Sequence, residues 1–273
     1  MNTQFKLKKM KPILIYFFVC MFIFLSCSQT KESPRSSRVL NPGKSLPSES
    51  AQIQQFIKNN PDDGTPSVSK GLVSKGTLLN GKLVPYSGLN FQYFDDQSYL
   101  LGRGFVHSSV KKILLDSYME LHSIFPNHRF YIMETCNKNG GELTPHQTHQ
   151  NGLSVDFMMP LLKDGKEYIG LDTIGSTHYF LNFDDKGKYS QDSTIQINFN
   201  IVAEHILELD QKARENGMRI EKVIIKLELK DELYTCEYGE ALKASGIYIV
   251  KSLTPSINQL HDEHYHIDFG YIK

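Results

Sequence analysis

Two short segments of the sequence concentrate side chains that can bind a metal ion. The first, residues 145–157, reads PHQTHQNGLSVDF and carries Asp156, and the second, residues 261–269, reads HDEHYHIDF. Five of the ten histidines lie in these segments: His146, His149, His261, His264 and His266. Neutral imidazole and carboxylate both suit zinc, and a catalytic zinc site usually takes three protein ligands and leaves one position for water. The two segments therefore predict a catalytic metal site.

The spacing between His149 and Asp156 fits two local structures. Seven residues are nearly two helical turns, so both side chains would share one face of a helix. A turn followed by a strand fits as well. We favour the turn and strand, because Asn151-Gly152 is a turn signal and Asp156 lies between Val155 and Phe157, which are typical strand residues.

The C-terminal segment is expected to form a strand over residues 264–271. Alternate residues of a strand face the same side, so His264, His266 and Asp268 should share one face. One histidine can bind the metal while the other reaches the metal-bound water or the substrate. The ion lowers the pKa of bound water to about 7, and a histidine can then move the protons. Asp268 can orient the histidine that binds the metal.

These residues resemble the pattern of a known family. GGELTPHQTHQNGLSVDF followed by the late HDEHYHIDF is similar to the penicillin-insensitive murein endopeptidases. They belong to a wider group of zinc peptidases that includes lysostaphin-type peptidases, D-Ala-D-Ala metallopeptidases and the hedgehog signalling domain. The group's pattern is His, six residues, Asp, and a later His-x-His. The resemblance covers residues 79–273.

The resemblance implies a role for most of these side chains. It implies that His149, Asp156 and His266 bind Zn²⁺ and that His264 is the catalytic histidine beside the metal. Further histidines of the subgroup match His146 and His261, which we expect at the rim of the site as candidates for holding substrate. A weaker match is His107, in the run RGFVH.

The chain also departs from the family. Residues 163–200 match none of its motifs, and we expect this segment to shape the substrate groove. The best-known members carry several cysteine pairs, whereas this chain keeps at most Cys136 and Cys236 for a disulfide.

The N-terminus has the features of an export signal. Lysines at positions 6, 8, 9 and 11 precede an apolar run over residues 13–25. A membrane-spanning helix needs about 20 apolar residues, whereas the core of a signal peptide needs about 7 to 15. The basic flank disfavours the alternative of a short buried helix.

The apolar run ends in Phe-Leu-Ser-Cys, which resembles a lipoprotein cleavage box. We therefore predict a signal peptide over residues 1–27, with cleavage before Cys27 and lipid on that cysteine. The alternative is ordinary cleavage without lipid. The prediction places the protein in the periplasm, anchored by lipid to the bacterial (outer) membrane. Residues 28–75 are rich in polar residues and indicate a disordered tether, so the zinc metallopeptidase domain is expected over residues 76–273.

The catalytic region predicts an α+β fold, in which helices pack on a mostly antiparallel central sheet that carries the metal site. Helices are expected over residues 108–125, capped by Ser108 or Ser109, and over 199–216 and 231–244. Strands are expected over residues 129–134, 221–229, 247–250 and 264–271. His205 lies on the apolar stripe of the second helix, where a structural role is favoured over metal binding. Residues 163–191 are expected to form a loop or hairpin whose scattered His178 and aspartates are more typical of a surface than of a second metal site.

Three functions follow from these predictions. The first is a zinc-dependent murein endopeptidase that hydrolyses the peptide cross-links of bacterial peptidoglycan, with stem peptides as substrate. The second is a D-Ala-D-Ala carboxypeptidase or dipeptidase of the same fold, which would need a basic residue to bind a free carboxylate; Arg103 or Arg129 could serve, although the sequence assigns neither. The third is a non-catalytic cell-wall-binding lipoprotein. A formal net charge of zero argues against nucleic acid as a partner. The sequence leaves the cleaved bond and the oligomeric state open.

Overall fold

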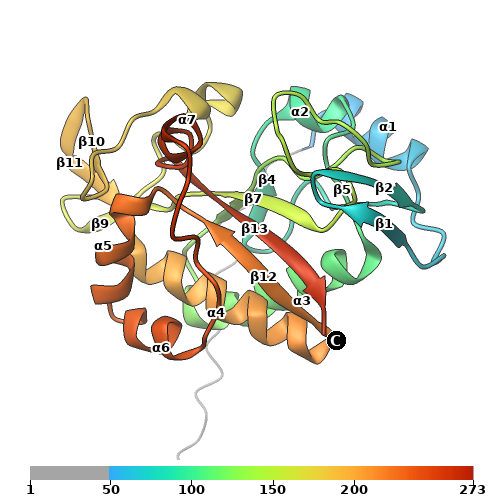
Figure 1. The fold of residues 1–273 in the computed structure, drawn as a ribbon. Coiled ribbons are helices and arrows are strands. Elements are labelled where there is room, and N and C mark those ends of the chain that lie inside the picture. Colours follow the sequence, from blue (N-terminus) through green and yellow to red (C-terminus); the bar gives the residue numbers. More distant parts are fainter. Residues whose placement is uncertain (1–48, 273) are drawn as a thin grey trace, which may run out of the picture. The chain divides into compact units, whose positions relative to one another are not determined.

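A five-stranded sheet lies at the centre of the fold (Figure 1). The computed structural model describes residues 49–272, so the predicted signal peptide and Cys27 lie outside the described residues. The strand order is β12-β13-β7-β6-β4, and every neighbouring pair is antiparallel except β4 and β6. The strands are β4 (Phe91–Tyr93), β6 (Phe130–Ile132), β7 (Ser154–Met158), β12 (Met218–Ile224) and β13 (His264–Tyr271). The predicted α+β class, with a mostly antiparallel central sheet, is confirmed.

The register of β7 and β13 decides which side chains meet on the sheet. His266 pairs with Asp156 and His264 pairs with Met158. Because successive side chains point to opposite faces, Tyr265 and Phe157 lie on the other face. Their rings stack there with centroids 5.4 Å apart. The predicted turn and strand around Asp156 is therefore correct, and so is the predicted strand over residues 264–271.

Two long helices, α3 (Ser108–Ile124) and α4 (Phe199–Glu215), cover the face that carries Tyr265 and Phe157 (Figure 1). Both helices were predicted at these positions. In α3 the apolar residues recur every three or four positions and face the core. The predicted cap of α3 was wrong: His107 is the N-cap, and its Nδ1 accepts a hydrogen bond from the backbone N–H of Ser109 at 3.1 Å. Asn198 caps α4, where its side chain accepts a hydrogen bond from the backbone N–H of Ile201.

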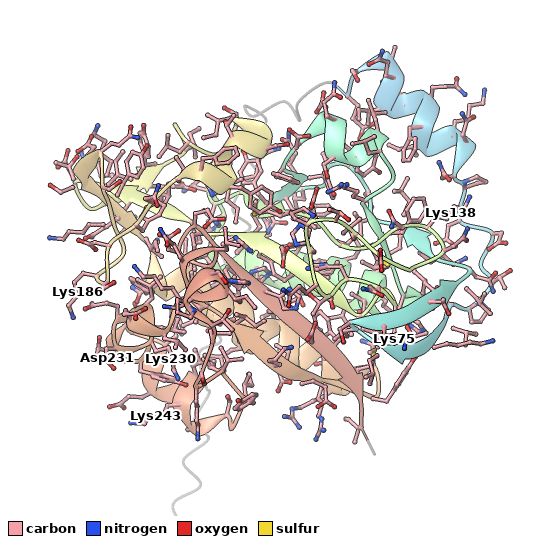
Figure 2. The ribbon with its side chains drawn as sticks, turned by 45° about the horizontal axis from the view of Figure 1, so that its top comes forward. Lys75, Lys138, Lys186, Lys230, Asp231 and Lys243 are labelled. Carbon is pink, nitrogen blue, oxygen red and sulfur yellow. The ribbon has the colours of Figure 1, made fainter. Side chains whose placement is uncertain are left out.

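A second sheet forms beside the first from the segment that matched no motif. Its order is β10-β11-β8-β9, and all pairs are antiparallel. A 3₁₀ helix, η1 (Gly175–Phe180), lies between its two hairpins. Lys186, in the turn before β10, pairs with Glu232 of α5 at 2.8 Å, and Figure 2 shows Lys186 and Asp231 along the same edge of the molecule. The bounds are β8 (Leu161–Lys163), β9 (Lys166–Tyr168), β10 (Lys188–Tyr189), β11 (Asp192–Ile197) and α5 (Lys230–Thr235).

The predicted tether was wrong for residues 49–75. This part of the chain forms helix α1 (Ala51–Asn59) and strand β1 (Val68–Leu72), which pairs with β2 (Lys75–Leu79). Ile53 of α1 is fully buried in the core. The prediction from composition failed because most side chains of α1 and β1 face solvent, which gives the segment the polar composition of an unfolded linker. Residues 28–48 of the predicted tether lie outside the described part of the chain.

Other boundaries differ from the prediction for local reasons. The expected helix over residues 231–244 is two helices, α5 and α6 (Gly239–Ala244), because Cys236 between them has extended backbone. Strand β12 begins at Met218 and ends at Ile224, before the short 3₁₀ helix η2 (Leu227–Leu229). Instead of the expected strand over 247–250, a single bridge joins Val223 to Ile249.

Several short elements complete the fold. Strands β3 (Lys82–Leu83) and β5 (Phe105–Val106) pair with each other. Helix α2 (Asp96–Leu100) follows β4, and α7 (Pro255–Gln259) begins at the N-cap Thr254 and precedes β13. Across residues 49–272, the helices are all too short or too polar to cross a membrane.

Candidate metal centre

Asp156 is the residue around which the candidate site is built. It lies on β7 and is buried. Its Oδ1 lies 2.8 Å from Nδ1 of His266 and 3.2 Å from Nε2 of His149, and these two ring nitrogens are 3.1 Å apart. Its Oδ2 lies 3.5 Å from Nδ1 of His146. Three histidines from two distant parts of the sequence thus surround one carboxylate.

His149 presents a defined ring nitrogen to this carboxylate. It lies in the loop before β7 with φ of 65°, in the left-handed region that residues other than glycine seldom adopt. Its Nδ1–H donates a hydrogen bond to the carbonyl oxygen of Thr135 at 2.6 Å. Since a neutral imidazole has one N–H, the lone pair of Nε2 faces Asp156.

His266 is oriented in the same way from the opposite strand. Its Nε2–H donates to Oδ1 of Asp268 at 2.7 Å, so in the neutral ring, the form that binds a metal ion, the lone pair of Nδ1 faces Asp156. Asp268 also accepts hydrogen bonds from Ser154 Oγ at 2.6 Å and Lys222 Nζ at 2.8 Å. The contact that sequence alternation predicted between Asp268 and His266 is therefore present. A carboxylate on the outer nitrogen is the usual way in which a metal-binding histidine is held.

The converging atoms fit a cation. In the neutral rings, Nε2 of His149 and Nδ1 of His266 are both acceptors, and they face the oxygen of a carboxylate. Among the described residues, Asp156 Oδ2 is buried and makes no hydrogen bond. The group His146, His149 and Asp156, whose ligand atoms lie within 4.8 Å of one another, can hold a metal ion. His266 Nδ1 adds a fourth donor atom, and the third nitrogen, to this set.

The charges around the cluster favour positive charge at its centre. Burial alone would raise the pKa of Asp156, but His149 and His266 hold it well below its usual range. Burial alone would likewise lower the pKa of His266, but Asp268 and Asp156 raise it to about 9. Burial dominates at His149 and lowers its pKa, which favours the neutral ring that a metal ion requires.

A glutamate that sequence reasoning missed holds His146. Oε2 of Glu134, just beyond β6, lies 2.5 Å from Nε2 of His146. Oε1 of the same carboxylate pairs with Arg103 at 2.8 Å and accepts from Ser98 Oγ at 2.9 Å. Arg103 also donates to the carbonyl oxygen of Thr144 at 2.9 Å. The only signal in the sequence was an acidic residue directly after the apolar run Phe-Tyr-Ile-Met.

His264 lies on the same face of β13 as His266, two residues earlier. Its Nδ1 lies 2.6 Å from Oε1 of Glu263, and burial lowers its pKa to about 4. The ring of His261 lies 4.8 Å from it, centroid to centroid, and Nδ1 of His261 donates to the carbonyl oxygen of Ile257 at 2.6 Å. Hydrogen bonds to Nε2 of these two rings are absent from the described residues, so both atoms are free to meet a substrate.

Tyr179 is a second residue that sequence reasoning missed. It belongs to η1, in the segment that matched no motif. Its ring makes edge contacts with His146, at a centroid distance of 6.1 Å, and with His264, at 5.4 Å. The segment therefore reaches the candidate site through Tyr179.

Other candidates lie outside the cluster. His107 is bound at both ring nitrogens, to Ser109 and to the Tyr271 hydroxyl at 3.1 Å, which assigns it to capping α3. His205 is buried against Tyr265, Phe130 and Phe157, as a structural histidine would be.

Two further possibilities from the sequence concern a second metal and a disulfide. The ring nitrogens of His178 face the carbonyl oxygens of Leu171 and Glu263, each at 3.1 Å, so they do not join the nearby aspartates in a second metal site. Cys136 and Cys236 are free cysteines.

Comparisons with family models and with curated proteins do not identify a family for this chain. No family model matches the chain, and a search of curated proteins finds no match.

Proposed function

We propose that the chain is a zinc-dependent murein endopeptidase, which hydrolyses peptide cross-links of bacterial peptidoglycan. The observation that carries the proposal is the convergence of His149 Nε2, His266 Nδ1 and Asp156 Oδ1 within 2.8–3.2 Å of one another. Each histidine is held through its outer nitrogen, which matches a three-ligand zinc site. Bound there, zinc would acidify a water molecule and polarise the scissile carbonyl group.

His264 is the residue that we assign to proton transfer. Because burial lowers its pKa to about 4, its ring is neutral at neutral pH and can accept a proton. Glu263 holds Nδ1, which leaves Nε2 for the reacting groups. In the hydrolysis, water adds its oxygen to the carbonyl carbon, the C–N bond breaks, and the leaving nitrogen receives a proton. His264 takes a proton from the water and returns it to the amine.

His146 and His261 are assigned to the substrate. His146 lies against Asp156 and is held by Glu134, and these two acids raise its pKa against the opposing effect of burial. It is therefore a donor suited to a substrate oxygen. His261 lies beside His264 and is neutral, because burial lowers its pKa to about 3.

The arrangement of Arg103 favours an endopeptidase over a carboxypeptidase. A carboxypeptidase needs a cation that is free to bind the terminal carboxylate of its substrate. The guanidinium of Arg103 is paired with Glu134 and bound to the Thr144 carbonyl oxygen. The other candidate, Arg129, lies near Gln92, with Nη1 3.4 Å from the Gln92 Oε1. Trimming of stem peptides and binding without turnover remain the alternative functions.

The proposed location follows from the substrate. A murein endopeptidase works outside the cytoplasm, and the basic flank and apolar run before Cys27 are those of an exported lipoprotein. Lipid on Cys27 would hold the catalytic part close to the peptidoglycan mesh.

The test is a digestion analysed by mass. Full-length protein loaded with zinc is incubated with cross-linked muropeptide dimers, beside the His264→Ala variant. The proposal predicts that dimers become monomers only with the wild-type protein. Release of a single terminal D-Ala would instead identify a carboxypeptidase. If the dimers stay unchanged although the protein has bound zinc, the alternative of a non-catalytic binding protein would be favoured.

A further inference from the structure

The hydroxyl group of Tyr179 is a buried donor for which the described residues provide no acceptor. A buried polar group normally finds a hydrogen-bond partner, so an unpaired one points to an unseen oxygen or to a functional role. A functional role is favoured for Tyr179 because its ring contacts two residues of the candidate site, His146 and His264.

The position of Tyr179 is fixed by its surroundings. Its ring packs edge-on against Phe94 at a centroid distance of 5.7 Å. The helix that carries it, η1, is held by hydrogen bonds of two of its residues, Ser176 and His178. The backbone N–H of Ser176 donates to Asp95 Oδ2 at 2.9 Å, and the ring of His178 lies between the carbonyl oxygens of Leu171 and Glu263. The phenol ring is therefore held in one place.

The chemistry of the hydroxyl shows what it can do. A tyrosine hydroxyl has a pKa of about 10, so it keeps its proton at neutral pH and can donate a hydrogen bond. Among the described residues, neither Asp156 nor Glu134 accepts a hydrogen bond from it. The O–H is left for an oxygen atom that is not part of the protein.

We propose that Tyr179 is a catalytic residue, whose O–H donates a hydrogen bond to the carbonyl oxygen of the scissile peptide bond. This role rests on the proposed function. The hydrogen bond strengthens as negative charge develops on that oxygen during attack by water, so it stabilises the transition state more than the bound substrate. The proton stays on the phenol throughout, and no bond to Tyr179 forms or breaks.

The same position explains why the unmatched segment matters to the site. Glu263 O and Met159 N are hydrogen-bonded at 3.1 Å, and His178 meets the same carbonyl oxygen, so η1 is joined to the strand ends that carry Asp156 and His264. Tyr179 therefore reaches His146 and His264 from an element outside the five-stranded sheet.

The test compares Tyr179→Phe with a matched control, Tyr118→Phe, in full-length protein loaded with zinc. The hydroxyl of Tyr118 is also buried with no partner in residues 49–272, but its ring packs in the core against Phe91 and Phe130. We expect Tyr179→Phe to lower kcat about 100-fold, as loss of one oxyanion donor does, while KM changes by less than about twofold. Tyr118→Phe should keep wild-type kcat.

Thermal unfolding and zinc content separate catalysis from structure. Since the Tyr179 hydroxyl has no partner to lose, Tm and zinc content should equal those of the wild-type protein. Wild-type kcat in Tyr179→Phe would overturn the role. A loss of activity that comes with a lower Tm and lost zinc would overturn it as well, because it would make the hydroxyl structural. No cleavage by zinc-loaded wild-type protein would instead overturn the proposed function itself.

Discussion

Asp156 and His266 face each other across two antiparallel strands, with Asp156 Oδ1 2.8 Å from His266 Nδ1. They are 110 positions apart in the sequence and form a direct pair of the β7–β13 ladder. The distance between the two side chains is thus set by the spacing of neighbouring strands, which is a rigid part of any sheet. His149, from the loop before β7, completes the group.

The first prediction concerns the metal. Replacing His266 by Ala removes one nitrogen donor from the group around Asp156, so bound zinc should fall from one ion per chain to background. Peptide hydrolysis should be lost with it. Metal content by mass spectrometry of the purified protein measures this. His122→Gln is the matched control, since His122 lies on α3 outside the cluster, and it should keep its zinc. Retention of zinc by His266→Ala would remove His266 from the ligands.

A second prediction concerns Asp268, which binds no metal itself. Asp268→Asn keeps the shape of the side chain but loses the negative charge that fixes the His266 ring. Zinc affinity should fall about 10–100-fold. Competition with a chelator measures the affinity. Lys222→Gln, which removes the other charged partner of Asp268, should change the affinity much less. Equal affinities for all three proteins would show that Asp268 does not act on the metal.

The third prediction concerns pH and the core. Burial lowers the pKa of His205 to about 3, whereas its pKa in the unfolded chain is about 6.5. Between these values the unfolded chain binds the proton and the folded protein does not, so stability falls as pH falls below 6.5, by about 1.4 kcal/mol per pH unit. Above pH 6.5 this contribution is constant.

His205→Phe isolates this effect. At pH 7 the variant should be less stable by about 1–3 kcal/mol, because the Tyr265 hydroxyl loses its partner. At pH 5 the gap to the wild-type protein should narrow or reverse. Urea unfolding at the two pH values measures it, and a gap that stays the same would mean that His205 takes up a proton in the folded protein as easily as in the unfolded chain.

The sequence predicted the site residues that lie on the sheet better than the residues that surround them. The alternation of residues 264–271 put His264, His266 and Asp268 on one face, and the turn signal at Asn151-Gly152 placed Asp156 on a strand. Local patterns of this kind follow from the period of a strand. Glu134, Glu263 and Tyr179 carried no such pattern. They reach the histidines through tertiary packing from separate elements, which one sequence does not reveal.

The prediction for the N-terminal part of the domain was wrong. Residues 49–75 have the composition of a disordered tether, yet they form α1 and β1 on the surface of the domain. Ile53 is the one fully buried residue of the helix, while Phe56 and Ile57 pack against the core partly buried, and composition averages do not detect so few apolar contacts.

The fourth prediction tests the packing of Ile53. Ile53→Ala leaves a cavity in the core and should lower the free energy of unfolding by about 2–5 kcal/mol. Gln54→Ala, at an exposed position of the same helix, should change it by less than about 0.5 kcal/mol. Thermal and urea unfolding of the full-length protein give both values. Equal stability of the two variants would mean that the segment does not pack on the domain.

The most direct test of the central claim follows hydrolysis and metal in one sample. Full-length protein is assayed with muropeptide dimers as purified, after removal of metal with a chelator, and after zinc is added back. We predict one zinc ion per chain, loss of cleavage with the metal, and recovery with zinc. Full cleavage of the dimers by the metal-free protein would contradict a zinc peptidase built on His149, Asp156 and His266.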